Sequence, residues 1–233
     1  MLRPATLRRL EDRVRELQKG FPGYVDAFAT AKLFTGPSLH FHERTLHVLR
    51  EHGYAAKALQ DERYVEMLYA TLASWGMHRM GPGNTKLVAF TDFRRVLAEN
   101  SRAITELEPY SVLDALPAKI VQRLCALAKK VRVSPARTYL VSSSKVLHHV
   151  LPQLVPPIDN EYTLSFFLHS VILDGENDES VMATIFPYFN QLGRAQAAFI
   201  RESIGYGYMN TSASKLLDNG IVGYCLRHLR NTV

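Results

Sequence analysis

The chain has 233 residues, of which 47% are hydrophobic and 21% charged, so its composition is that of a globular protein and not of a disordered segment. Its formal net charge of +6 permits an anionic partner without selecting one. Only two cysteines, Cys125 and Cys225, are present, which excludes a disulfide-rich scaffold or a cysteine-rich zinc site and predicts buried reduced thiols.

No apolar run reaches the ~20 residues needed to cross a bilayer, and the amphipathic, charged N-terminal segment lacks the apolar core of a signal peptide. We therefore expect a soluble, cytoplasmic protein with no membrane partner. The sequence contains no motif for a cofactor or a metal, and none is expected.

The first half of the chain has the spacing of successive amphipathic helices. Leu7, Leu10, Val14 and Leu17 share one face of a first helix, which Gly20 and Pro22 should end. Further helices are expected over about 24–34, 38–53, 62–75 and 91–106. Residues 76–85 contain three glycines and a proline, which predicts a loop.

The second half continues the helical pattern. Pro109 and Ser111 should open a helix, which Pro117 divides from a longer one ending near residue 131. Ser134-Pro135 should begin the next helix, and Lys145 should start a short apolar one. The remaining helices are expected over about 159–173, 179–203 and 212–230.

Alternation of period two never persists, so the predicted fold is all-α, with about ten helices. So many helices in this length cannot form a simple bundle of four long rods. We expect one compact unit or two helical lobes, with about 1–60 and 160–233 packed together and about 61–159 forming a central lobe.

The middle of the chain carries a block of positive charge. No acidic residue lies between Asp114 and Asp159, and residues 115–158 carry seven basic ones: Lys119, Arg123, Lys129, Lys130, Arg132, Arg137 and Lys145. Such a block inside a folded domain predicts a surface that faces a polyanion. The expected partner is DNA, or alternatively RNA.

Two side chains at the end of this block could carry chemistry. A lysine amine can attack a sugar C1′ atom if burial and nearby cations lower its pKa, which makes Lys145 a candidate nucleophile. The carboxylate of Asp159 could stabilise an oxocarbenium ion or move protons. A purely structural interpretation stays open, in which Lys145 is a surface residue and Asp159 caps the next helix.

Ser144-Lys145-Val146 followed by Pro157-Ile158-Asp159 resembles the helix-hairpin-helix DNA glycosylases, especially the 8-oxoguanine type. The resemblance covers about residues 134–160 and implies a base-excision glycosylase with possible lyase activity on a damaged base. It implies that Lys145 is the Schiff-base nucleophile and Asp159 the catalytic carboxylate. The hairpin glycines of that family are replaced by serines, Ser142, Ser143 and Ser144, which should then meet the DNA backbone, and the interval from lysine to aspartate is short for the family.

Four further residues are candidates for the pocket. Trp75, the only tryptophan, could stack on a base or pack in the core, and His149 lies one helical turn after Lys145 on the same face. Tyr206 and Tyr208 lie on a glycine-containing turn and could line a pocket.

The other motifs leave alternatives open. His42 and His47 are five residues apart and do not form the His-Glu-x-x-His zinc motif, so packing or exposed histidines are expected there. Besides the enzyme, the sequence allows a non-catalytic nucleic-acid-binding module, or a helical regulatory protein that binds another protein through residues 1–19.

Overall fold

The computed structural model describes residues 4–78, 86–168 and 177–229. These ranges form α-helices joined by turns, with no strand among them, which confirms the all-α class. The elements are α1 (Pro4–Lys19), α2 (Phe21–Ala31), α3 (Pro37–His52), α4 (Ala55–Ala58), α5 (Glu62–Leu72), the π-turn η1 (Ala73–Met77), α6 (Phe90–Leu107), α7 (Ala118–Lys130), α8 (Leu140–Val150), α9 (Thr163–Leu168), α10 (Asp178–Ala195), α11 (Ala197–Ser203) and α12 (Ala213–His228).

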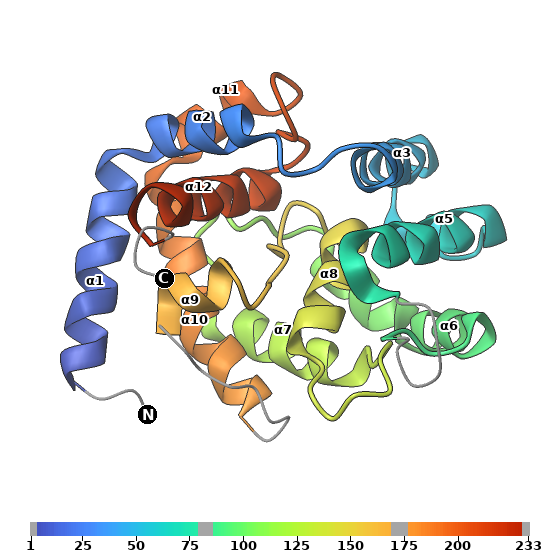
Figure 1. Ribbon diagram of the computed structural model, residues 1–233. Helices are drawn as coiled ribbons and strands as arrows, with labels where there is room; N and C mark the ends of the chain where they lie inside the picture. Colours follow the sequence, from blue (N-terminus) through green and yellow to red (C-terminus); the bar gives the residue numbers. More distant parts are fainter. Residues whose placement is uncertain (1–3, 79–85, 169–176, 230–233) are drawn as a thin grey trace.

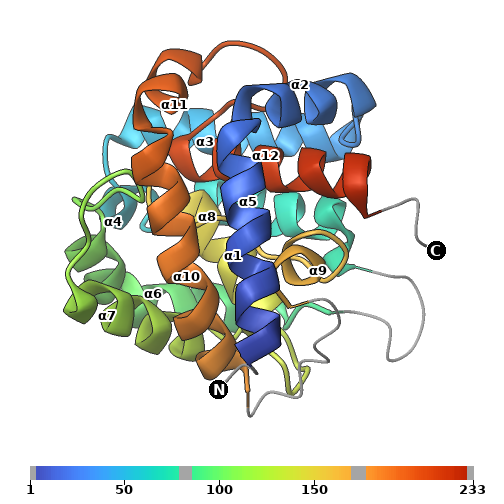
Figure 2. The ribbon, with the colours of Figure 1, turned by 90° about the vertical axis from the view of Figure 1, so that its left-hand side faces the viewer.

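Helix α8 lies near the middle of the molecule, where α3, α5, α7 and α10 pack around it (Figure 1). Helix α12 runs alongside α2, and α1 runs beside α10 (Figure 2). One continuous cluster of buried apolar side chains extends from Leu10 in α1 to Cys225 in α12. Cys125 and Cys225 are both free and buried, as predicted.

Glycines in α12 allow α2 to approach it closely. A Cβ atom on Gly223 would lie 1.8 Å from the backbone oxygen of Tyr24, and one on Gly220 would lie 2.4 Å from the ring of Phe21. Because nearly every position from Ala213 to Cys225 is buried, α12 is an interior helix. Polar residues along it are therefore in the core and need partners there.

Several predicted helix boundaries were wrong. Residues 109–117 and 132–139 are irregular, and α8 begins at Leu140, so Lys145 lies inside the helix and not at its start. The start of α8 is fixed from a distance, because the buried carboxylate of Asp178 in α10 accepts the N–H groups of Tyr139 at 2.5 Å and Leu140 at 2.9 Å. The expected helix over 179–203 is divided at Gln196 into α10 and α11.

Other boundaries agree with the sequence. Helix α1 ends before Gly20, and the Ser212 hydroxyl caps α12 by accepting the N–H of Lys215. Pro22 lies in the first turn of α2, where its missing N–H group is not needed. No helix in the described ranges combines the length and apolar character that crossing a lipid bilayer requires.

Candidate functional site

Lys145 and Asp159 line the same pocket, a cavity of about 240 Å³ that we call the lysine pocket. They reach it from different elements, Lys145 from α8 and Asp159 from the segment between α8 and α9. The rest of the lining is mixed in character: Leu33, Phe34, Ser38, Ser74, Trp75, Pro157, Ile158 and Asp218. The pocket thus brings one amine and two carboxylates together between apolar walls.

The Lys145 amine is held by a backbone carbonyl. Its Nζ atom donates to the Trp75 oxygen at 3.2 Å. This carbonyl lies in the π-turn η1, where Trp75 and Gly76 leave helical geometry and Gly76 has a φ of 77°. A positive φ favours glycine, and π-turns are frequent at functional sites. The indole N–H of Trp75 donates to the Ser38 oxygen, which fixes the ring against α3.

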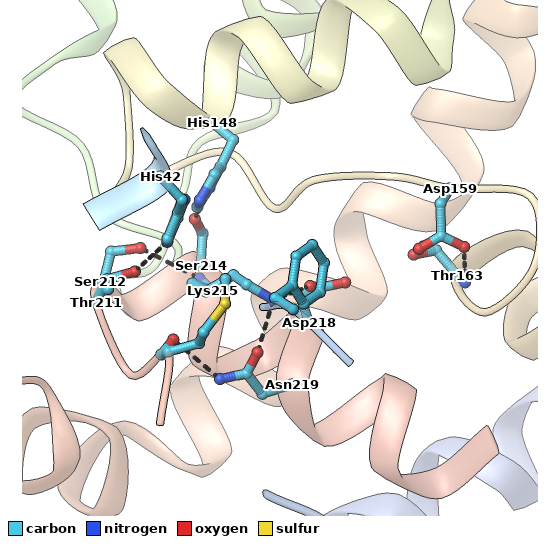
Figure 3. Close-up of polar contacts among 12 residues, drawn as sticks. His42, His148, Asp159, Thr163, Thr211, Ser212, Ser214, Lys215, Asp218 and Asn219 are labelled. Carbon is cyan, nitrogen blue, oxygen red and sulfur yellow. Dashed lines mark hydrogen bonds and ion pairs between the residues drawn. The ribbon is translucent and has the colours of Figure 1, made fainter. Parts of the chain in front are cut away.

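Asp159 has the capping role that the sequence predicted, and it also lines the lysine pocket. Its Oδ1 atom accepts the N–H groups of Tyr162 at 2.6 Å and Thr163 at 3.3 Å, in the turn that leads into α9 (Figure 3). No ion pair within 4.0 Å joins it to Lys145 in the described residues. The structural and the chemical interpretation of Asp159 are therefore compatible.

Burial shifts both groups toward their neutral forms. It lowers the pKa of the Lys145 amine, with Lys86 adding to the effect and Asp159 and Asp218 opposing it. It raises the pKa of Asp159, against the N–H bond from Tyr162 and the nearby Lys145 charge. An amine with a lowered pKa in a cleft is a common feature of nucleophilic lysines.

A second buried lysine, Lys215, adjoins the pocket. Its side chain is 0% exposed, and its Nζ donates to Asp218 at 2.6 Å and to Asn219 at 2.7 Å (Figure 3). The ammonium also lies over the rings of Phe28 and Phe34, 4.7 and 5.2 Å from their centroids. Burial raises the pKa of Asp218 to about 6, although the Lys215 charge opposes this.

This group was not predicted from the sequence, although its spacing there indicates it. Lys215, Asp218 and Asn219 have the spacing i, i+3, i+4, so they share one face of an otherwise apolar helix. Three polar residues on one face of an interior helix must find partners inside the protein.

A larger cavity of about 490 Å³, the outer pocket, also has Lys145 in its wall. Its other lining residues are of mixed character: Gly76, Met77, Lys86, Ser134, Ala136, Thr138, Val141, Ser142 and Asn160. Lys145 thus lies between the lysine pocket and the outer pocket. The irregular segment 132–139 forms part of the wall.

The other six basic residues of the charge block are exposed. Four lie on α7, where Lys129 pairs with Glu179 of α10 at 2.9 Å. Arg132 and Arg137 lie on the segment that contributes Ser134, Ala136 and Thr138 to the outer pocket, and the Arg132 guanidinium covers the Tyr139 ring at 5.1 Å. Exposed basic residues therefore lie both on α7 and on the segment that lines the outer pocket.

The prediction that Ser142, Ser143 and Ser144 form a hairpin facing DNA was wrong. All three lie inside α8 and are buried, Ser143 and Ser144 with 0% exposure. Ser143 donates to the Val131 oxygen at 2.6 Å, and Ser144 accepts the Ile158 N–H at 3.0 Å. These bonds hold α8 to the segments on either side, and of the three serines Ser142 lines the outer pocket.

The four further pocket candidates are dispersed. Trp75 lines the lysine pocket, but His149 is fully buried beside two other histidines. Tyr206 is 76% exposed. The Tyr208 hydroxyl bonds to the backbone of Phe34, whose side chain lines the lysine pocket. Tyr208 therefore supports a wall of the pocket from behind.

No family model matches this chain, and comparisons with curated proteins and with solved structures find no match either.

Proposed function

We propose that the protein binds DNA and acts on a damaged nucleotide extruded from it, as a DNA N-glycosylase with lyase activity. The observation that supports this best is the convergence of Lys145 and Asp159 on one pocket, where burial lowers the pKa of the amine. The resemblance of residues 134–160 to helix-hairpin-helix glycosylases gives the same two residues the same two roles.

The chemistry needs a neutral amine beside a carboxylate. The Lys145 nitrogen would form a bond to C1′ of the extruded sugar while the bond from C1′ to the base nitrogen breaks. The developing positive charge on the sugar ring would be stabilised by Asp159, and the proton lost by the amine would pass to the leaving base through a carboxylate. The C1′–O4′ bond then breaks, O4′ keeps the electron pair and takes a proton from solvent, and a protonated imine remains between Lys145 and C1′.

The walls suit an extruded nucleotide. Phe34 and Trp75 give the lysine pocket apolar faces, and the outer pocket, lined by both polar and apolar side chains, includes residues of segment 132–139. Extrusion is required because the reacting atom cannot be reached inside a duplex. The exposed cations of α7 and of segment 132–137 would hold the phosphate backbone, which predicts a strong dependence of affinity on salt.

Borohydride trapping tests this function. Duplexes carrying an abasic site, 8-oxoguanine or another modified base are incubated with the protein and borohydride, which reduces the imine to a stable secondary amine. We expect a covalent adduct with at least one duplex, and none with Lys145→Ala. Lys86→Ala is the matched control, because Lys86 lines the outer pocket but not the lysine pocket, and it should still give the adduct.

The absence of an adduct with every duplex, together with unchanged base release in Lys145→Ala, would reject the enzyme. A non-catalytic nucleic-acid-binding module is then favoured by the exposed cations of α7, which need no catalytic pocket. Binding that weakens linearly in a log–log plot against salt, without base release, would identify it. A slope near zero would reject both functions.

A further inference from the structure

Three histidines meet in the interior between α3 and α8. His42 comes from α3, and His148 and His149 are consecutive in α8. All three are 0% exposed, and one ring nitrogen from each lies within 4.8 Å of the others. The rings of His42 and His148 are stacked, with centroids 5.7 Å apart, and lie beside Thr211 and Ser214 (Figure 3).

The hydrogen bonds determine which nitrogens carry protons. The Nδ1 atoms of His148 and His149 face the carbonyl oxygens of Val155 at 3.0 Å and Lys145 at 2.8 Å. A carbonyl only accepts, so both Nδ1 atoms donate, and in the neutral rings both Nε2 atoms keep a lone pair. The Nε2 of His148 is buried and has no hydrogen-bond partner.

His42 completes the arrangement. Its Nδ1 lies 3.0 Å from the Nε2 of His149, and its Nε2 lies 2.9 Å from the Thr211 hydroxyl, which can donate or accept. His42 can therefore carry its proton on either nitrogen. With the proton on Nε2, donated to Thr211, the Nδ1 lone pair joins those of His148 and His149.

We propose that His42 Nδ1, His148 Nε2 and His149 Nε2 bind one divalent transition-metal ion, with zinc the preferred one. Zinc binds imidazole nitrogen at about 2.0–2.1 Å, so tetrahedral ligands lie about 3.3 Å apart. Because the His42 and His148 rings are nearly parallel, at 7°, they must also tilt so that both in-plane lone pairs point at one ion. The second nitrogen of each ring already bonds to a carbonyl or hydroxyl, as is usual for metal-binding histidines.

The electrostatics of the cluster are compatible with this. Burial holds the pKa of His42 and His148 well below the usual value and lowers that of His149 to about 4, so the rings are neutral ligands at pH 7. The Lys215 charge opposes a cation there, but its ion pair with Asp218 offsets that charge. Thr211 connects the cluster to a surface cavity of about 460 Å³, through which an ion and a fourth, solvent ligand could arrive.

Such an ion would stiffen the wall of the lysine pocket. The Trp75 ring stacks on His42 and His148, with centroids 5.1 and 6.2 Å away, and the Trp75 carbonyl accepts the Lys145 amine. His149 bonds to the backbone of Lys145 itself. The inference does not depend on the proposed function, since it concerns only binding of the ion.

The test uses zinc and cobalt salts with the full chain, freed of metal by chelation. Cobalt reports its own geometry, because tetrahedral Co²⁺ has intense visible absorption bands. We expect one equivalent of Co²⁺ to bind with those bands, Zn²⁺ to displace it, and Zn²⁺ to raise the melting temperature. His148→Gln should weaken binding by at least about 100-fold.

His47→Gln is the matched control, because His47 lies on α3 like His42 but is exposed and paired with Glu51. It should bind cobalt as the unaltered chain does. If His148→Gln does not fold, Thr211→Val, which removes only the hydroxyl beside His42, should still weaken cobalt binding at least about tenfold. Failure of the unaltered chain to hold one equivalent of cobalt, or equal binding by the histidine-cluster variants and the control, would overturn the proposal.

Discussion

Acid should destabilise the metal-free protein through its buried histidines, and His149 gives the magnitude. Its pKa is about 4 in the folded protein, against about 6.5 for an unperturbed histidine. Because the folded value is the lower one, the unfolded chain takes up the proton first. The stability contribution of neutral His149 is therefore complete above pH 6.5 and is lost as the pH falls from 6.5 to 4.

The difference of about 2.5 units corresponds to about 3 kcal/mol for this one group, at 1.36 kcal/mol per unit. The pKa values of His42 and His148 are shifted in the same direction, again chiefly by burial. Nearby positive charges act in the same sense: the Lys215 charge lowers the pKa of all three rings, the Arg50 charge that of His42 and the Lys145 charge that of His149. A loss of 3 kcal/mol is a large share of the stability of a typical domain.

The assay is urea unfolding followed by circular dichroism, with chelator present, at several pH values from 7.5 to 4.5. The free energy of unfolding should fall steeply below pH 6.5 in the unaltered chain. His149→Gln should lose about 3 kcal/mol of that dependence, whereas His47→Gln, an exposed histidine, should keep it all. Parallel curves for the unaltered chain and His149→Gln would refute the assignment of acid sensitivity to this ring.

Three further substitutions test the packing around the site, each by thermal or urea unfolding. Gly223→Ala should lower the free energy of unfolding by about 3 kcal/mol because the new Cβ would meet the Tyr24 backbone. Gly23→Ala is the control: the nearest neighbour of its Cβ is a flexible arginine at 3.7 Å, so the free energy of unfolding should stay the same or rise by up to about 1 kcal/mol. Equal effects would show that α2 and α12 are not in close contact. Asp178→Ala should lower the free energy of unfolding by roughly 3 kcal/mol, because two N–H groups at the start of α8 lose their acceptor. Glu179→Ala breaks only the exposed ion pair with Lys129 and should lower it by less than about 1 kcal/mol. Lys215→Met should cost about 3–5 kcal/mol because Asp218 loses its buried counter-charge and must either stay ionised without it or take up a proton, and adding Asp218→Asn should recover part of this, so a double variant no better than the single one would contradict the ion pair.

The helical class followed from hydrophobic spacing, because that spacing depends only on residues close together in the chain. The start of α8 did not follow from it. Its N–H groups are satisfied by Asp178, which lies on a helix much further along the sequence, so the local Ser134-Pro135 signal was misleading. A cap supplied by a distant helix leaves no trace in the sequence around the helix that it caps.

Some residues of the candidate site could also be predicted from the sequence, and others could not. Lys145 and Asp159 could be selected from the charge block and a local motif, and both line one pocket. The histidine cluster could not be selected in this way, because the spacing of His42 and His47 shows only whether two histidines on the same helix could share a metal ion. The actual neighbours of His42 are His148 and His149, which the packing of α3 on α8 brings beside it.

The polar groups behind the lysine pocket are costly to keep. Lys215, Asp218, Asn219 and the three histidines are all nearly or fully buried. Replacing a buried ion pair by apolar residues of similar volume is often neutral or stabilising, so stability alone does not account for their presence. Three of them adjoin Lys145 or its pocket: Asp218 lines the pocket, Lys215 lies over Phe34 and His149 bonds to the Lys145 backbone. A preorganised amine needs such a surrounding of fixed dipoles and charges, because solvent cannot supply them in a closed pocket. Under the proposed function, this arrangement would position Lys145 and tune its pKa.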